Sequence, residues 1–102
     1  MIKGETMAAY LYILRLKSGN IYIGTTLNLS QRVREHVEGR ACRTTSLDPP
    51  LQLRLSEQHI TFRDARKRED QIKRWTRAKK EALVSGDIET LRKLAKSRED
   101  QK

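Results

Sequence analysis

The sequence predicts a small α/β (α+β) domain in which a three-stranded antiparallel sheet is flanked by helices. Two short segments rich in β-forming residues lie on either side of a turn at 17–19, and alternating leucines begin after residue 50. Helical periodicity occurs between the second and third segments and again after residue 61. With 102 residues there is room for one domain, which we place at 1–96 with its core at about 8–85 and a disordered tail at 97–102.

The first two strands, at 10–16 and 20–24, are predicted to form a hairpin. A three-residue loop, with Gly19 in the left-handed conformation, sets its register so that Leu14 opposes Tyr22. A two-residue loop would put Tyr22 on the other face of the sheet. With three residues, alternation places three tyrosines on one face: Tyr10, Tyr12 and Tyr22.

A first helix is predicted at 29–38, because Asn28 followed by Gln31 resembles a capping box. Its apolar stripe recurs every four residues, and Arg32 and His36 lie one turn apart beside that stripe. The stripe consists of Leu29, Val33 and Val37. Gly, Pro, Ser and Thr residues indicate a loop at 39–50, and a third strand follows at 51–55.

Thr61 is the predicted cap of a second helix with an unusual inward face. Phe62, Ala65, Ile72 and either Trp75 or Thr76 fall on that face, and so does Glu69. Burying an unpaired carboxylate costs several kcal/mol, so Glu69 requires a partner. Further helices are predicted at 77–84 and from Ile88 through Leu94, separated by Ser85-Gly86-Asp87.

The charge balance indicates a polyanionic partner. There are 22 Lys+Arg against 13 Asp+Glu, a net charge of +9. Residues 63–80 alone contain nine of the 22 Lys and Arg and only three acidic residues, although such a run can equally be a solvated helix face. The residues predicted to bind nucleic acid are Arg66, Lys67, Lys73, Arg74, Arg77, Lys79 and Lys80.

Several protein classes are excluded by composition. No apolar run approaches the roughly 20 residues of a membrane span, and the N-terminus lacks the layout of a secretory signal. Cys42 is the only cysteine, so no intrachain disulfide can form, and with two histidines it cannot complete a four-ligand zinc site. We therefore expect a cytoplasmic protein without contact to membranes.

These candidate residues could together catalyse the transfer of a phosphate group. They are two tyrosines on one face of the sheet, an arginine and a histidine of the first helix, and the inward glutamate of the second. A lone carboxylate with waters can hold Mg²⁺, and a guanidinium matches phosphate oxygens bidentately. Each member also has a structural alternative, because strand tyrosines pack across strands and Arg32 and His36 can be ordinary residues at a helix edge. Glu69 can instead pair with a core-facing Arg32.

The order and spacing of these residues resemble the GIY-YIG nuclease superfamily, in particular its small stand-alone members. The resemblance covers about residues 8–85. The motifs that carry it are Tyr10-Leu11-Tyr12, Tyr22-Ile23-Gly24, Asn28-Leu29 with Arg32 and His36, and the segment from Ala65 to Trp75 that contains Glu69.

The resemblance implies a site that cleaves phosphodiesters with one divalent metal, Mg²⁺ or in its place Mn²⁺. Tyr12 matches the tyrosine proposed as general base, and Tyr22 matches the one that orients the nucleophile or phosphate. Arg32 would stabilise the scissile phosphate, with His36 as a polar or proton-handling neighbour. Glu69 would hold the metal across from Tyr12 and Arg32.

The chain departs from the family pattern in three places. The first motif reads Tyr10-Leu11 instead of Gly-Ile, Thr25-Thr26 stands where many relatives have a lysine, and no asparagine follows Asn28. These departures suggest a reduced or substrate-restricted nuclease.

We therefore expect a Mg²⁺-dependent endonuclease acting on DNA, directed by structure more than by base sequence, with a role in DNA repair. The sequence does not distinguish DNA from RNA, and we expect a monomer or weak dimer. The alternatives are a nucleic-acid-binding module with little or no cleavage, and an interaction subunit of a larger complex.

Overall fold

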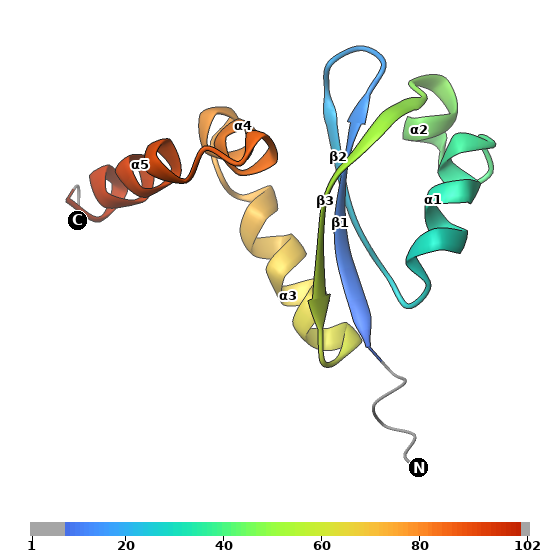
Figure 1. Cartoon of the computed structure of the whole chain (residues 1–102), viewed down its shortest axis with the longest axis horizontal. Coiled ribbons are helices and arrows are strands. Elements are labelled where there is room, and N and C mark those ends of the chain that lie inside the picture. The colour runs from blue at the N-terminus through green and yellow to red at the C-terminus, as the bar shows by residue number, and fades with distance from the viewer. Residues whose placement is uncertain (1–7, 101–102) are drawn as a thin grey trace.

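The protein is described by a computed structural model over residues 8–100, and it has the predicted three-stranded antiparallel sheet with flanking helices (Figure 1). The strand order is β2-β1-β3, so β1 is central and the other two strands form the edges. In chain order the elements are β1 (Ala9–Leu16), β2 (Ile21–Thr26), α1 (Leu29–Val37), α2 (Arg43–Leu47), β3 (Pro50–His59), α3 (Phe62–Lys73), α4 (Arg77–Ser85) and α5 (Ile88–Asp100).

The β1–β2 hairpin has the predicted register. Leu14 pairs with Tyr22, and Tyr12 pairs with Gly24. Gly19 closes the turn with a φ of 98°, a left-handed value that favours glycine. Gly24 is needed for a different reason, because a Cβ at this position would lie 2.5 Å from the Tyr12 hydroxyl oxygen.

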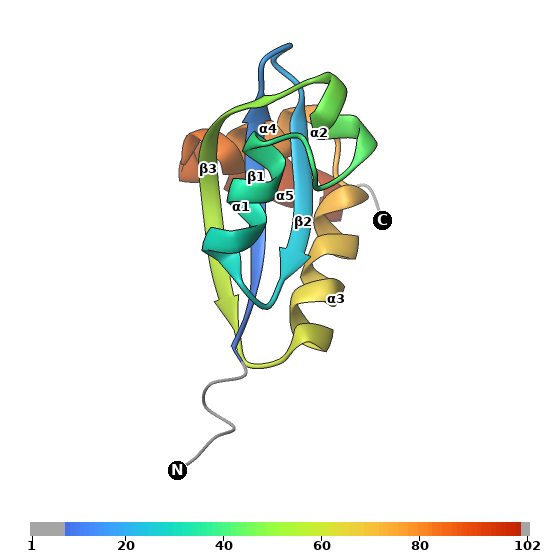
Figure 2. The ribbon, with the colours of Figure 1, turned by 90° about the vertical axis from the view of Figure 1, so that its right-hand side faces the viewer.

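The two faces of the sheet carry different helices. In Figure 1, α1 and α2 lie on one side of the sheet, and α3 and α4 lie on the other. Figure 2 looks onto the α1 side, where α1 crosses in front of the strands. The α3 side holds a cluster formed by Leu11, Ile13, Ile23, Ile72 and Val84. The α1 side holds a second cluster formed by Tyr12, Leu14 and Leu16, against which Tyr22 and Leu29 pack.

The helices begin where their caps were predicted. Asn28 accepts a hydrogen bond from the Gln31 amide at 3.1 Å, and Thr61 does the same for Asp64 at 3.1 Å. At the other end, α4 stops at Gly86, whose φ is 75°. Side-chain caps of this kind stabilise a helix by about 1 kcal/mol each.

The apolar stripe predicted for α1 is wrong at its C-terminal end. Val37 is the last helical residue and is 64% exposed, whereas His36 is fully buried. The helix therefore turns Leu29, Arg32, Val33 and His36 toward the sheet, since residues three and four apart share a face. The Tyr12 hydroxyl and Thr45 both bond to the His36 ring, so its burial leaves no ring nitrogen unsatisfied.

Three further secondary-structure elements differ in extent from the prediction. The expected loop at 39–50 contains α2, which brings Thr45 into the interior. The third strand continues past residue 55 to His59, because the polar residues of its second half pair with β1 and because Arg68 binds Glu57 at 3.0 Å. The second predicted helix ends at Lys73, before Trp75.

The last helix is longer than expected. It extends from Ile88 to Asp100, so the predicted tail at 97–102 is helical as far as Asp100, and residues 101–102 lie outside the described residues. Residues 1–7 of the predicted domain also lie outside them. Of the helices described, none is long and apolar enough to cross a membrane.

Candidate active site

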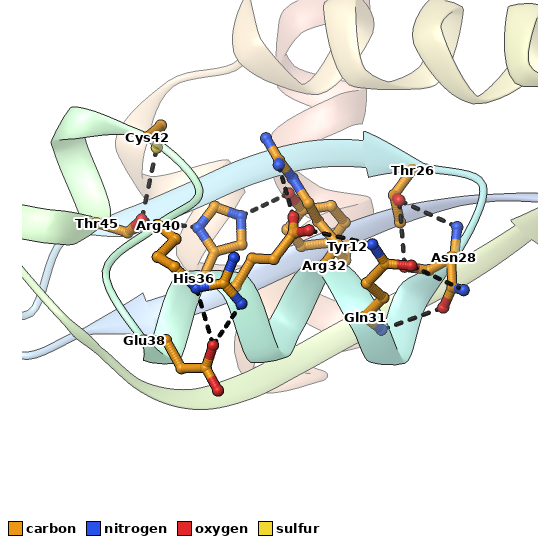
Figure 3. A network of polar contacts seen from close by, with 11 residues as sticks. Tyr12, Thr26, Asn28, Gln31, Arg32, His36, Glu38, Arg40, Cys42 and Thr45 are labelled. Carbon is orange, nitrogen blue, oxygen red and sulfur yellow. Dashed lines mark hydrogen bonds and ion pairs between the residues drawn. The ribbon is translucent and has the colours of Figure 1, made fainter.

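A buried chain of hydrogen bonds joins β1 to the two helices on the α1 side (Figure 3). The Tyr12 hydroxyl lies 2.7 Å from His36 Nε2, and His36 Nδ1 lies 2.7 Å from Thr45 Oγ1. All three residues are at most 1% exposed. The arrangement is directional: when Tyr12 donates to Nε2, the Nδ1–H donates to Thr45, and the other tautomer reverses both bonds.

Burial keeps the hydrogen-bonded side chains of Tyr12 and His36 uncharged at neutral pH. It lowers the pKa of His36 to about 4, with the nearby Arg32 charge acting in the same direction. Burial also raises the pKa of Tyr12, although the adjacent Arg32 guanidinium opposes that shift. The free protein therefore holds a neutral imidazole against a protonated phenol.

Tyr22 completes an aromatic cluster with these two rings. Its ring centroid lies 5.0 Å from that of His36 and 6.3 Å from that of Tyr12. Burial is the main reason that the pKa of Tyr22 is raised strongly. The structure therefore brings together Tyr12, Tyr22 and His36, as the resemblance implied.

Arg32 lies at the boundary between this buried cluster and solvent. Its Nη1 donates to Glu35 Oε1 at 3.0 Å. Arg32 also lines an open hollow of about 360 Å³ between the end of β2, the start of α1 and the start of α3. We call this the Arg32 hollow, and its lining residues are Thr25, Thr26, Leu27, Asn28, Gln31, Arg32, Glu35 and Phe62.

Glu69 reaches the same end of β2 from the α3 side of the sheet. It is 9% exposed, and Thr25 Oγ1 donates to its Oε1 at 3.2 Å. Lys73 Nζ lies 2.6 Å from its Oε2, and Arg66 Nε lies 4.0 Å from Oε1. The alternative in which Glu69 pairs with Arg32 is wrong, because Glu69 pairs with cations one turn away on its own helix.

Two threonines belong to the site although the sequence did not single them out for it. Thr25 lines the Arg32 hollow and bonds Glu69, so it connects the two faces of the sheet. Strand alternation was the available signal, since it puts Thr25 with Ile23 on the face away from Tyr22. Thr45 gave no such signal, because it lies in α2, which was expected to be a loop.

The acidic groups limit which metal the site could hold. Among the described residues, no three His, Cys, Asp or Glu side chains form a metal-binding group. Mg²⁺ differs from transition metals in that one or two carboxylates, water and substrate phosphates suffice to bind it. Glu69 fits that role, provided that Lys73 leaves its Oε2, and Glu35 is a second carboxylate on the Arg32 hollow.

The basic residues predicted to bind nucleic acid are divided among several environments. Arg66 and Lys73 flank Glu69, and Lys79 lies 4.2 Å from the Trp75 ring centroid. Arg77 pairs with Glu81 at 3.1 Å. Arg66, Lys67, Lys73, Arg74 and Arg77 are exposed, and Lys79 and Lys80 are half-buried.

The fold and this set of residues define a nuclease-type catalytic domain, and comparison with known proteins agrees. The family model described as the GIY-YIG catalytic domain matches residues 8–82. The chain therefore belongs to the GIY-YIG catalytic domain family, whose members are nucleases acting on nucleic acid.

Its relatives include several small bacterial UPF0213 proteins. One from Staphylococcus saprophyticus is 36% identical over 76 residues, covering 74% of this chain and 93% of the relative. The UPF0213 protein YazA of Bacillus subtilis is 32% identical over 80 residues, covering 78% and 81%. The solution NMR structure of a UPF0213 protein from Bacillus halodurans is 33% identical with a TM-score of 0.52, covering 78% of this chain and 84% of that one.

Proposed function

We propose that the protein is a Mg²⁺-dependent endonuclease that hydrolyses phosphodiester bonds in DNA and is directed by DNA structure more than by base sequence. The observation that carries this proposal is the Arg32 hollow. Arg32 lines it directly, and Thr25 connects it to Glu69 on the opposite face of the sheet. A phosphate in the hollow would therefore contact the guanidinium while lying close to the carboxylate.

In this proposal Arg32 binds the scissile phosphate and stabilises the negative charge that grows as the bond to water forms. Glu69 would hold the cation, which supplies Lewis-acid stabilisation of the phosphoryl oxygens. Thr25 positions Glu69 through its 3.2 Å hydrogen bond.

Tyr12 is the proposed general base. The Arg32 charge favours loss of its proton to solvent, and His36 Nε2, 2.7 Å away, is the polar neighbour that holds the phenol oxygen in place. The phenolate would then accept a proton from the attacking water. Burial acts against this transfer in the free protein, so the phenol becomes basic only when further positive charge arrives. Tyr22 lies against both rings and fixes their orientation.

The substrate is argued from charge. A net charge of +9, with basic residues concentrated on α3 and α4, favours a phosphate backbone and predicts affinity that falls steeply with salt. We propose DNA as the substrate, with RNA as the comparison in the test. We further propose that the protein acts in the cytoplasm in DNA repair, as a monomer or weak dimer.

A second candidate function is nucleic-acid binding with little or no cleavage. Two observations favour it: Lys73 already neutralises Glu69, and the pKa of both site tyrosines is raised. Under this candidate the basic surface of α3 and α4 would still bind the phosphate backbone.

The test is a panel of single-stranded, duplex, nicked and branched DNA and RNA, incubated with Mg²⁺ or Mn²⁺. We expect Arg32→Ala to lower the cleavage rate by roughly 100- to 1000-fold, the effect of removing one donor to a developing oxyanion. Glu69→Gln should abolish metal-dependent cleavage while retaining most binding.

Matched controls lie on the same helices. Arg34→Ala and Asp70→Asn change exposed side chains of α1 and α3 and should leave cleavage unchanged. Binding without cleavage by the parent protein would support the second candidate. Equal cleavage by the parent, Arg32→Ala and Glu69→Gln would reject the assigned site.

A further inference from the structure

Lys73 is placed between two sites. Its ammonium lies 2.6 Å from Glu69 Oε2, and the same side chain lines a second hollow of about 310 Å³ on the outer side of β2. We call this the Lys73 hollow, and its lining residues are Ile21, Tyr22, Ile23, Lys73 and Lys80. Lys73 can therefore serve either the carboxylate or a ligand in the hollow.

The composition of the Lys73 hollow favours an anion. Both of its charged lining residues are lysines, and the other three come from an edge strand of the sheet. Lys80 is kept near β2 by its neighbour Glu81, which binds Arg15 of β1 through two contacts at 2.6 and 2.9 Å. This clamp fixes α4 against the hairpin and so keeps Lys80 close to the start of β2.

In the free protein, Lys73 occupies the place that a cation on Glu69 would need. Thr25 bonds Oε1 and Lys73 bonds Oε2, so both carboxylate oxygens of Glu69 are engaged. The Lys73 side chain is 54% exposed and sits on a flexible stem, so it can leave without disturbing the core. Glu69 itself is nearly buried, so its carboxylate needs another positive charge when the ammonium leaves, which the divalent cation would supply.

We propose that the Lys73 hollow binds a backbone phosphate of the nucleic acid, and that Lys73 moves from Glu69 to this phosphate and thereby opens Glu69 to the divalent cation. This inference rests on the proposed function and deepens it. Lys73 then couples two events, because nucleic acid removes the ammonium that competes with the cation.

The geometry of β2 gives the spacing between the two phosphates. The Lys73 hollow contacts β2 at Tyr22, and the Arg32 hollow contacts it at Thr26. Four residues of strand span about 13 Å at a rise of about 3.3 Å each. The proposed phosphate therefore lies about 13 Å from the scissile bond, measured along β2.

The coupling must act in both directions. A protein whose Glu69 is neutralised by Lys73 binds Mn²⁺ weakly when alone and more tightly with nucleic acid bound. Removing the ammonium should raise the affinity for Mn²⁺ in the free protein and should remove the enhancement by nucleic acid.

The experiment measures Mn²⁺ binding by isothermal titration calorimetry, with and without a single-stranded phosphorothioate DNA that resists hydrolysis. We expect Lys73→Met to bind Mn²⁺ at least about fivefold more tightly than the parent, the lower end of typical coupling between sites. The DNA should tighten Mn²⁺ binding to the parent protein but not to Lys73→Met. Glu69→Gln should lose the Mn²⁺ site in both conditions.

Lys80→Met is the matched control, because it removes the same charge from the same hollow but has no contact with Glu69. It should weaken DNA binding and leave the affinity of the free protein for Mn²⁺ unchanged. Equal Mn²⁺ affinity in the parent and Lys73→Met, or no Mn²⁺ binding by either, would overturn the inference.

Cleavage by the parent protein is scored separately on the substrate panel. Cleavage without an effect of Lys73→Met on Mn²⁺ rejects this inference and leaves the nuclease proposal standing. Coupling without cleavage of any substrate supports the inference and rejects the nuclease proposal.

Discussion

The two faces of the sheet hold their parts of the candidate site in different ways. On the α1 side, Tyr12, His36 and Thr45 are buried, uncharged and joined by hydrogen bonds of 2.7 Å. On the α3 side, Glu69 forms ion pairs with basic side chains of its own helix, and the side chain of the lysine that binds it is 54% exposed. The part of the site on the α1 side is thus embedded in the folded core, whereas the ion pair between Lys73 and Glu69 on the α3 side can rearrange when a ligand binds.

The largest expected effect on stability comes from protonating His36. Its folded pKa of about 4 lies below the ordinary value of 6.5, so the unfolded chain binds more protons between these values. The stability is fully present above about pH 6.5 and is lost as the pH falls toward 4, by about 3 kcal/mol in total.

Urea denaturation at pH 7.5, 6.5, 5.5 and 4.5 measures this loss. In His36→Gln, the fall in unfolding free energy between pH 6.5 and 4.5 should be much smaller than in the parent protein. A parent whose stability does not change over that range would contradict a buried neutral His36.

A smaller loss is expected for Tyr12→Phe. The change removes the hydroxyl that bonds His36 Nε2 and leaves that nitrogen buried without its partner, which costs about 1 to 3 kcal/mol. Thermal unfolding followed by circular dichroism measures it. Tyr10→Phe is the control, because Tyr10 lies on the same sheet face but is only half-buried. Equal losses for the two variants would argue against a structural role for the Tyr12–His36 bond.

The smallest expected effect on stability is that of Thr25→Val on the α3 side. Valine preserves the shape and strand preference of threonine but cannot donate to Glu69 Oε1, so we expect a loss of about 1 kcal/mol or less. Cleavage should fall more clearly than stability, because Glu69 loses a contact that orients it. Thr44→Val is the control, because it changes an exposed threonine of α2 that lines neither hollow. A fall in stability without any change in cleavage would remove Thr25 from the site.

Local pattern was sufficient to predict the hairpin and the helix starts. Alternation and a three-residue loop gave the pairing of Leu14 with Tyr22, and capping patterns gave the helix starts after Asn28 and Thr61. These features depend on neighbours in sequence. The full length of β3 was missed because its polar second half is stabilised by β1 and by the distant Arg68.

In the candidate site, too, features set by local sequence were predicted and features set by distant contacts were missed. The convergence of Tyr12, Tyr22 and His36 followed from strand alternation together with the family resemblance. The buried role of Thr45 depends on α2, five residues that only tertiary contacts make helical. The partner of Glu69 was also missed, because spacing alone could not choose between Arg32 on another element and Lys73 one turn away.

Gly24 adds a constraint on how this site can be altered. The hydroxyl end of the Tyr12 side chain occupies the space where any larger residue at position 24 would place its first side-chain carbon. The motif that contains Tyr12 and the motif that contains Gly24 are therefore in direct steric contact, although they are separated along the chain. Anyone who redesigns the pocket will have to change both positions together, by making room at 12 before adding bulk at 24.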